Sequence, residues 1–184
     1  KIAVIKNNII SIIIQIIFMI VNIALLTVTD TRTIDNDKSG AILIDKIKEC
    51  NHNLVDRKIC KDNKKDIVLI LKEWTNKKEI DVIITTGGTG LTGRDITPEA
   101  LDEIADKHIP GFGEVFRTIS LKTVGTSSIQ SRACAVLSNG KYIFALPGSS
   151  GGVKDAWDSI LKHQLDINHK PCNFVELFPR LKEK

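Results

Sequence analysis

Short apolar stretches along the chain have the composition of buried strands. They cover residues 22–28, 82–84 and 142–146, are rich in aliphatic or aromatic side chains, and each runs into turn residues. Such runs are typical of strands that are covered on both faces. A further strand, interrupted by charged residues, is predicted around Leu54, Val55 and Ile59.

Amphipathic segments separate the strands in the first half of the chain. After Ser39-Gly40, apolar residues recur at three- and four-residue steps, which indicates a helix with one buried face. The next helix follows Asp62 and Asn63, which are expected to cap it. The alternation of strand and helix predicts right-handed crossovers between parallel strands and a sheet with both faces covered. The apolar stripes of the two helices are formed by Ile42, Leu43 and Ile47 and by Ile67, Leu69, Ile70, Leu71 and Trp74.

Four helices are predicted in the second half of the chain. One of its helices is indicated by Ile129, Ala133 and Val136, which fall on a single helical face. Asn139-Gly140 indicates a turn before the last strand. The predicted helices cover residues 98–108, 114–121, 127–136 and 153–163, with a break at 110–113.

The strand at 82–84 is followed by a glycine-rich loop and then by a helix start. The loop, GGTG, leads past one acid to residues typical of an N-cap and a first helical turn, namely Asp95, Thr97, Pro98 and Glu99. Glycines let a ligand approach main-chain N–H groups, and a helix N-terminus favours an anion, so an anionic ligand such as phosphate is expected here. The alternative is a tight connection without a ligand. The loop has neither the P-loop lysine nor G-x-G-x-x-G spacing, so a generic nucleotide-binding label is unsupported.

A second loop of small residues, PGSSGG at 147–152, follows the last strand and precedes the last helix. Because the carboxyl ends of parallel strands lie at one edge of a sheet, the two loops can face one cleft. No internal repeat or low-complexity linker divides them. The sequence therefore predicts one domain with one main site.

Composition narrows the class of protein. A chain of 184 residues suits a single domain, and its net charge of +4 is modest. Aromatic residues make up only 5% of the chain and the lysines are spread out, so a nucleic-acid partner is not expected. The cysteines and histidines have no metal-ligand spacing, which argues against zinc.

Residues 1–20 are mostly apolar and dominated by isoleucine. A signal peptide fits their pattern, but no small-x-small cleavage site follows. A membrane anchor would need the segment 22–28 to lie in lipid, but the same segment is predicted to be the first strand of the sheet. We therefore expect residues 1–20 to be an apolar N-terminal extension outside a single domain of residues 21–184.

Four motifs in this order, TTGGTGLTGRDITPEA, PGFGEVFR, SIQSRA and FALPGS, closely resemble the molybdopterin-binding family that contains the molybdopterin adenylyltransferases. The segments 54–63 and 170–174 look most like the branch called molybdenum cofactor biosynthesis protein B. The resemblance spans about residues 22–174. It implies a three-layer αβα sandwich with a mostly parallel central sheet, assembly as a homotrimer or homohexamer, and work in the cytoplasm. Molybdopterin, a nucleotide and other molybdenum cofactor biosynthesis proteins are the partners that it implies.

The resemblance also implies a reaction and its residues. In catalytically competent relatives, AMP is transferred from Mg-ATP to the terminal phosphate of molybdopterin, and pyrophosphate is released. Asp95 and Asp62 match the family's functional aspartates and are the expected catalytic and magnesium-binding residues. The expected substrate-binding residues are Thr86, Gly87, Gly88, Thr89, Gly90, Thr97, Ser131, Pro147, Gly148 and Ser149.

Other interpretations stay open from the residues alone. Asp95 could be a loop residue that accepts backbone N–H groups, and Asp62 could be an N-cap. Arg32 could bind a phosphate or lie solvated on the surface, and Arg132 could line the pterin pocket or pair across a subunit interface. The second loop carries no basic residue before Lys154. The alternative function is therefore a noncatalytic protein that binds or carries molybdopterin.

Overall fold

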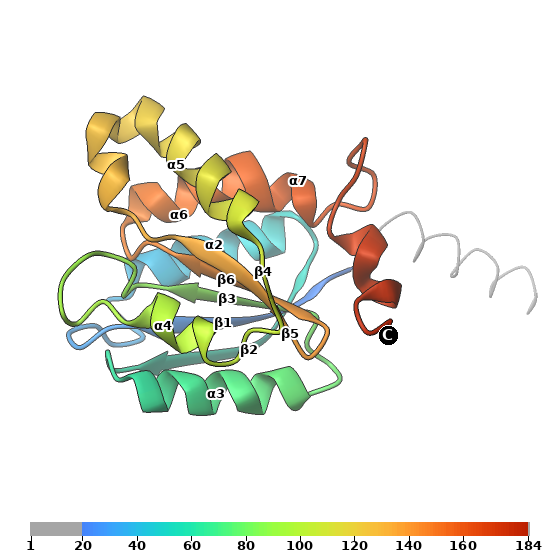
Figure 1. Ribbon diagram of the computed structural model, residues 1–184, viewed down its shortest axis with the longest axis horizontal. Helices are drawn as coiled ribbons and strands as arrows, with labels where there is room; N and C mark the ends of the chain where they lie inside the picture. Colours follow the sequence, from blue (N-terminus) through green and yellow to red (C-terminus); the bar gives the residue numbers. More distant parts are fainter. Residues whose placement is uncertain (1–19, 184) are drawn as a thin grey trace, which may run out of the picture.

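Parallel strands form the centre of the protein. The computed structural model describes residues 20–183 and contains a six-stranded sheet in the order β2-β1-β3-β6-β5-β4 (Figure 1). The first four strands in this order are parallel, whereas β5 and β4 run antiparallel to their neighbours. The strands are β1 (Asn22–Val28), β2 (Asn53–Cys60), β3 (Val82–Thr86), β4 (Lys107–His108), β5 (Cys134–Ser138) and β6 (Lys141–Leu146).

Helices cover both faces of the sheet. On one face lie α2 (Lys38–Glu49), α5 (Pro110–Val124) and α6 (Ser150–Ala156), and on the other lie α3 (Lys64–Asn76) and α4 (Thr97–Asp102) (Figure 1). This arrangement confirms the predicted three-layer αβα sandwich with a mostly parallel sheet. The remaining helical segments are a 3₁₀-helix at Gly125–Gln130, a π-helix at Trp157–Leu161, α7 (Lys162–Gln164) and a second 3₁₀-helix at Val175–Arg180.

The interior strand β1 lies between β2 and β3, and its sequence is apolar almost throughout. Ile23 and Leu25 pack into the core beneath α2 and α6, whereas Ala24 and Leu26 pack into the core beneath α3 and α4. All four side chains are fully buried. A strand covered on both faces has no side that calls for polar residues, so the alternation of a half-exposed strand is absent.

Several boundaries in the second half differ from the prediction. The helix predicted over 127–136 is wrong: this segment contains the end of the 3₁₀-helix at Gly125–Gln130 and the start of β5. The helix predicted over 98–108 ends at Asp102. Gly111 and Gly113 were expected in a break, but they lie in the first turns of α5, which begins at Pro110.

The predicted caps are corrected in part. Asn63 is the N-cap of α3, and its side-chain oxygen accepts hydrogen bonds from Lys65 N and Asp66 N at 2.9 and 3.4 Å. Asp62 lies before the cap. The N-cap of α4 is Ile96, which makes no side-chain capping bond, so the prediction that Thr97 caps this helix is wrong.

Within residues 20–183, no helix has the length and apolar character needed to cross a membrane. The interpretations of the N-terminal extension concern residues that, apart from Ile20, lie outside the described part of the chain.

Candidate functional site

The two small-residue loops touch at the carboxyl ends of β3 and β6. Gly87 N donates a hydrogen bond to Leu146 O at 3.0 Å, and Thr86 Oγ1 donates to Pro147 O at 2.9 Å. A Cβ placed on Gly148 would lie 3.3 Å from Gly87 Cα. The loops are therefore in van der Waals contact, as neighbouring parallel strands require.

Two glycines of the first loop are needed for backbone reasons. Gly87 has φ +103°, and a Cβ there would lie 2.2 Å from Val28 O. Gly88 has φ +65°, and a Cβ there would lie 2.4 Å from Thr97 Oγ1. Thr97 is fully buried and donates its hydroxyl to Gly87 O at 2.8 Å. Thus Thr97, like the buried Thr86, holds the loops in place and lines neither of the cavities described below.

A cavity of about 570 Å³ opens where the two loops meet. It is large enough for a ligand of several rings. Eight of the predicted substrate-binding residues line it, and Asp95 reaches it as well; the eight are Gly87, Gly88, Thr89, Gly90, Ser131, Pro147, Gly148 and Ser149.

A second cavity of about 330 Å³ adjoins the first. The two cavities share Gly88, Asp95 and Gly148 in their linings, so these residues form a common wall. The charged residues of the smaller cavity are Asp30, Arg32, Asp62, Arg94 and Asp95. The structure thus brings Asp62 and Asp95 to one cavity, although they are far apart in the sequence.

Asp95 is bound within its own loop. Its Oδ2 accepts hydrogen bonds from Thr92 N at 2.9 Å and Thr92 Oγ1 at 2.7 Å, and a Cβ placed on Gly90 would lie 2.8 Å from the same oxygen. Burial raises the pKa of Asp95, but hydrogen bonds from Thr92 and Gly90 outweigh it, so the pKa lies below its ordinary value. The carboxylate therefore both organises the loop and stays ionised at the common wall.

Asp62 has the opposite electrostatic environment. Its pKa is raised by burial first and then by the negative charges of Asp30 and Asp95, while Arg94 partly offsets them. Asp62 Oδ1 would lie 3.3 Å from a Cβ on Gly88, which places this carboxylate against the first loop. A ligand of positive charge would relieve the repulsion between the carboxylates.

The carboxylate pair fits a magnesium ion that is also held by substrate. Magnesium prefers oxygen ligands and is commonly bound through one or two carboxylates together with phosphate and water. Asp62 and Asp95 supply such oxygens in one cavity. Among residues 20–183 there is no group of three or more histidine, cysteine, aspartate or glutamate side chains arranged to hold a metal by themselves.

Arg32 lies beside the second loop. Its Nη1 donates to Gly148 O at 3.1 Å and to Ser39 Oγ at 2.8 Å. The same nitrogen lies 3.9 Å from Asp37 Oδ1. The guanidinium lines the smaller cavity and also fixes a carbonyl group of the loop, so it is partly committed to the protein's own structure.

One wall of the larger cavity was missed by the sequence analysis. It is formed by the face of α5 that carries Phe116, Ser120, Thr123 and Val124, and it continues to Asp155 of α6. Thr123 Oγ1 donates to Asp155 Oδ2 at 2.8 Å across the two helices. The spacing of Phe116, Ser120 and Thr123 is that of one helical face, but nothing local to this segment shows that the face meets the glycine loops.

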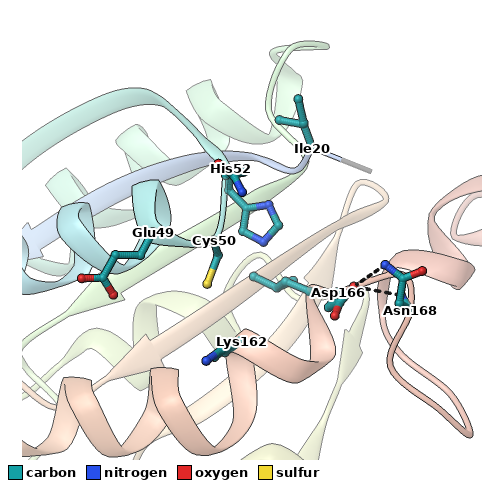
Figure 2. Close-up of a pocket in the computed structure, with 9 residues that line it drawn as sticks. Ile20, Glu49, Cys50, His52, Lys162, Asp166 and Asn168 are labelled. Atoms are coloured by element: carbon teal, nitrogen blue, oxygen red, sulfur yellow. Dashed lines mark hydrogen bonds between the residues drawn. The ribbon is translucent and has the colours of Figure 1, made fainter. Parts of the chain in front are cut away.

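A separate cavity of about 240 Å³ lies at the other end of β1 and contains none of the predicted site residues (Figure 2). His52 reaches into it, and its Nδ1 accepts a hydrogen bond from Val21 N at 3.3 Å. Burial lowers the pKa of His52 even though Asp166 acts to raise it. We therefore regard this histidine as part of the packing at the start of the sheet.

Known proteins are similar to this chain in sequence and in fold. Residues 24–167 match the family described as "Probable molybdopterin binding domain". Molybdenum cofactor biosynthesis protein B of Escherichia coli K12 is 43% identical over 166 residues, which cover 90% of this chain and 96% of that protein. The protein of the same description from Staphylococcus aureus MRSA252 is 44% identical over 149 residues, which cover 79% of this chain and 88% of that protein.

Solved structures agree with the sequence relatives. A crystal structure of molybdenum cofactor biosynthesis protein B superposes with a TM-score of 0.81 at 37% identity, covering 90% of this chain and 98% of that one. The tungsten cofactor synthesizing protein MoaB from Pyrococcus furiosus superposes with a TM-score of 0.70 at 35% identity, covering 78% and 92%. The chain therefore belongs to the molybdopterin-binding-domain family, in the branch of molybdenum cofactor biosynthesis protein B.

Proposed function

We propose that this protein acts in molybdenum cofactor biosynthesis, binding molybdopterin and transferring AMP from Mg-ATP to its terminal phosphate. The observation that carries the proposal is the pair of adjoining cavities with a common wall at Gly88, Asp95 and Gly148. A reaction that joins two bound molecules needs two neighbouring sites with the reacting groups at their junction. Membership of the family supports molybdopterin as one of the molecules.

The larger cavity suits the pterin and the smaller one suits the nucleotide phosphates. The larger cavity has an apolar wall from Phe116 and Val124 for a ring system, and Gly88 and Gly148 lie at its junction with the smaller one. The smaller cavity contains Arg32 and Arg94, whose guanidinium groups match phosphate geometry. In this proposal the terminal phosphate of molybdopterin would lie toward the common wall, next to the α-phosphate of ATP.

The proposed reaction needs little covalent participation by the protein. A terminal phosphate oxygen of molybdopterin forms a bond to the α-phosphorus of ATP, and the bond from that phosphorus to the oxygen bridging to the β-phosphorus breaks. Pyrophosphate leaves with the bonding electrons. The loops hold the two phosphates in line, and the arginines lower the repulsion between the anions. Asp62 and Asp95 would hold magnesium, which supplies further charge neutralisation when bound.

A noncatalytic carrier of molybdopterin is the second candidate. The larger cavity has no lysine or arginine among its described lining residues, and its acidic members are Asp95 and Asp155. An anionic pterin would therefore be held there by N–H groups, hydroxyl groups and packing alone. Such a site suits reversible binding and release as well as it suits catalysis.

Purified protein given molybdopterin and Mg-ATP separates the two functions. We expect pyrophosphate and adenylated molybdopterin to form together in equal amounts. Asp95→Ala should reduce transfer by roughly 10²–10³-fold, because charge stabilisation at the junction is lost, while pterin binding persists. The control is Asp45→Ala, which changes an exposed acid on α2. Bound pterin without pyrophosphate in the unmodified protein would favour the carrier, and unchanged turnover in Asp95→Ala would remove its assigned role.

A further inference from the structure

We propose that Arg132 is a positioning residue that closes the base of the loop at residues 90–95 and so aims Asp95 at the wall between the two cavities. The inference rests on the proposed function for its effect on transfer. Its structural part stands on contacts within the protein. Arg132 lines neither of the two cavities; it lines a separate cavity of about 620 Å³ that shares only Ser131 with the larger one, so it would act through the loop and not by touching a substrate bound between the two loops.

One guanidinium group ties both ends of the loop together. Arg132 Nε donates to Gly90 O at 2.7 Å, and its Nη2 donates to Asp95 O at 2.5 Å. The main-chain N–H of Arg132 also donates to Thr89 O at 2.8 Å. These bonds connect the loop to the segment just before β5, and β5 is a strand of the central sheet.

The third side-chain nitrogen fixes the arginine itself. Arg132 Nη1 forms an ion pair with Glu99 in the first turn of α4. The hydrogen bond from Arg132 lowers the pKa of Glu99 below its ordinary value, so this pair stays charged at neutral pH. The Arg132 side chain is 32% exposed, and three directed bonds restrict it far more than packing alone would.

The position of the Asp95 carboxylate depends on the base of the loop. The carboxylate binds the N–H and hydroxyl groups of Thr92 within the same loop, so it moves as the loop moves. Toward the tip, Leu91 is 66% exposed and a Cβ on Gly93 would meet nothing within 4 Å, while Arg94, whose side chain is 68% exposed, adds an ion pair with Asp30 at the surface. Arg132 therefore supplies a rigid attachment that the tip does not.

Lysine could not replace the arginine fully. The planar guanidinium presents several donors in fixed directions, which lets it reach Gly90 O, Asp95 O and Glu99 at once. An ammonium group on a flexible stem is a single point of attachment. We expect Arg132→Lys to keep the charge beside Glu99 while leaving one end of the loop free.

Arg117 provides a matched control. It is another half-buried arginine that binds main-chain carbonyls of the same segment, donating to Ser131 O at 3.4 Å and Ala133 O at 3.2 Å. None of its recorded bonds reaches the loop at residues 90–95. Arg117→Met should therefore perturb the segment before β5 without releasing the loop.

The test compares Arg132→Met, Arg132→Lys and Arg117→Met by amide hydrogen exchange and by steady-state kinetics with molybdopterin and Mg-ATP. We expect Arg132→Met to speed exchange of the amides of residues 90–95 at least tenfold and to lower kcat about 100-fold, as misplacement by about 1 Å does, with KM for molybdopterin within threefold. Arg132→Lys should lie between, and Arg117→Met should leave loop exchange and kcat within threefold.

Each outcome has a distinct meaning. Unchanged loop exchange in Arg132→Met, or a kcat loss equal to that of Arg117→Met, would overturn the positioning role. A rise in KM with unchanged kcat would also overturn it, since the residue would then act in substrate binding. Absence of transfer in the unmodified protein, with faster loop exchange in Arg132→Met, would reject the proposed function and keep the structural part. If Arg132→Met does not fold, Arg132→Lys and Glu99→Gln give the same comparison.

Discussion

Asp37 shows how one buried charge supports the region behind the second loop. Its side chain is inaccessible to solvent, and it accepts hydrogen bonds from Thr27 Oγ1 at 2.6 Å, Gly40 N at 2.9 Å and Arg57 Nη2 at 3.2 Å. Burial raises the pKa of Asp37, but these bonds outweigh it and the pKa lies below its ordinary value. The residue joins β1, β2 and the start of α2 at one point.

Asp37→Asn should lower the free energy of unfolding by about 2–4 kcal/mol, because the charge-assisted bonds are lost and Arg57 is left without its partner. Urea unfolding at pH 7 measures the change, with Asp35→Asn at an exposed position nearby as control. Since the folded pKa is depressed, the difference from the unmodified protein should be complete above about pH 4 and shrink as the pH falls further. A difference that stays constant down to pH 2 would contradict this account.

Asp62 leads to a prediction about the acid limb of activity. Burial and the charge of Asp30 raise its pKa, and Arg94, which lowers it, is ion-paired with Asp30. Asp30→Asn removes a negative charge and frees Arg94, and both changes favour ionised Asp62. The acid limb of the kcat profile against pH should therefore move to lower pH in the variant. A shift to higher pH, or none, would show that Asp62 does not limit activity in acid.

In the glycine loops between strands and helices, some glycines can be replaced by a larger residue and others cannot. Gly87→Ala would force a positive-φ residue against the backbone of β1, where its Cβ would lie 2.2 Å from Val28 O. We expect it to lower the free energy of unfolding by about 2–4 kcal/mol, since both the strained φ and the clash must be relieved. Gly93→Ala, where a Cβ meets nothing within 4 Å, should change stability by less than about 0.5 kcal/mol. Thermal or urea unfolding of the two variants measures this difference. An equal decrease in the free energy of unfolding in both variants would contradict a special backbone requirement at Gly87.

The elements that the sequence predicted well are those whose pattern is local. Strands β1, β3 and β6 are continuous apolar runs, and α2 and α3 have clear apolar stripes. The segment 127–136 failed because the spacing of Ile129, Ala133 and Val136 imitates a helix, whereas Val136 is held in β5 by pairing with β6. The Asn139-Gly140 turn, with φ of 48° and 71°, closes that hairpin and was the local signal that could have corrected the prediction.

The candidate site was predictable only where cavity-lining residues follow directly from a strand and its loop. The contact between the two loops could be predicted because both loops follow the carboxyl ends of parallel strands. The contribution of α5 depends on how the helix crosses the sheet, which no local pattern gives. Thr86 and Thr97 illustrate the same limit, because a threonine beside a glycine loop can face a ligand or, as here, bind the loop's own carbonyls.

The protein as a whole is proposed to assemble as a homotrimer or homohexamer. Val115 and Leu121 on α5 and Ile129 on the following 3₁₀-helix are 50%, 52% and 80% exposed, respectively. Apolar side chains gathered along one helix are a common feature of subunit interfaces. Sedimentation equilibrium over a range of concentrations should give a mass of three or six chains. A single 20.4 kDa species at micromolar concentration would contradict the assembly.

The exposed tip between Gly90 and Asp95 has a practical consequence. Gly93 has free space around it, while the two ends of the segment are joined below by Arg132. Extra residues added after Leu91, which is 66% exposed, would lengthen an already solvated bend at small entropic cost and leave the hydrogen bonds between Thr92 and Asp95 intact. Natural relatives could vary the length here without altering the chemistry, and a fluorescent reporter inserted at this point would sense ligand entry from just outside the cavity.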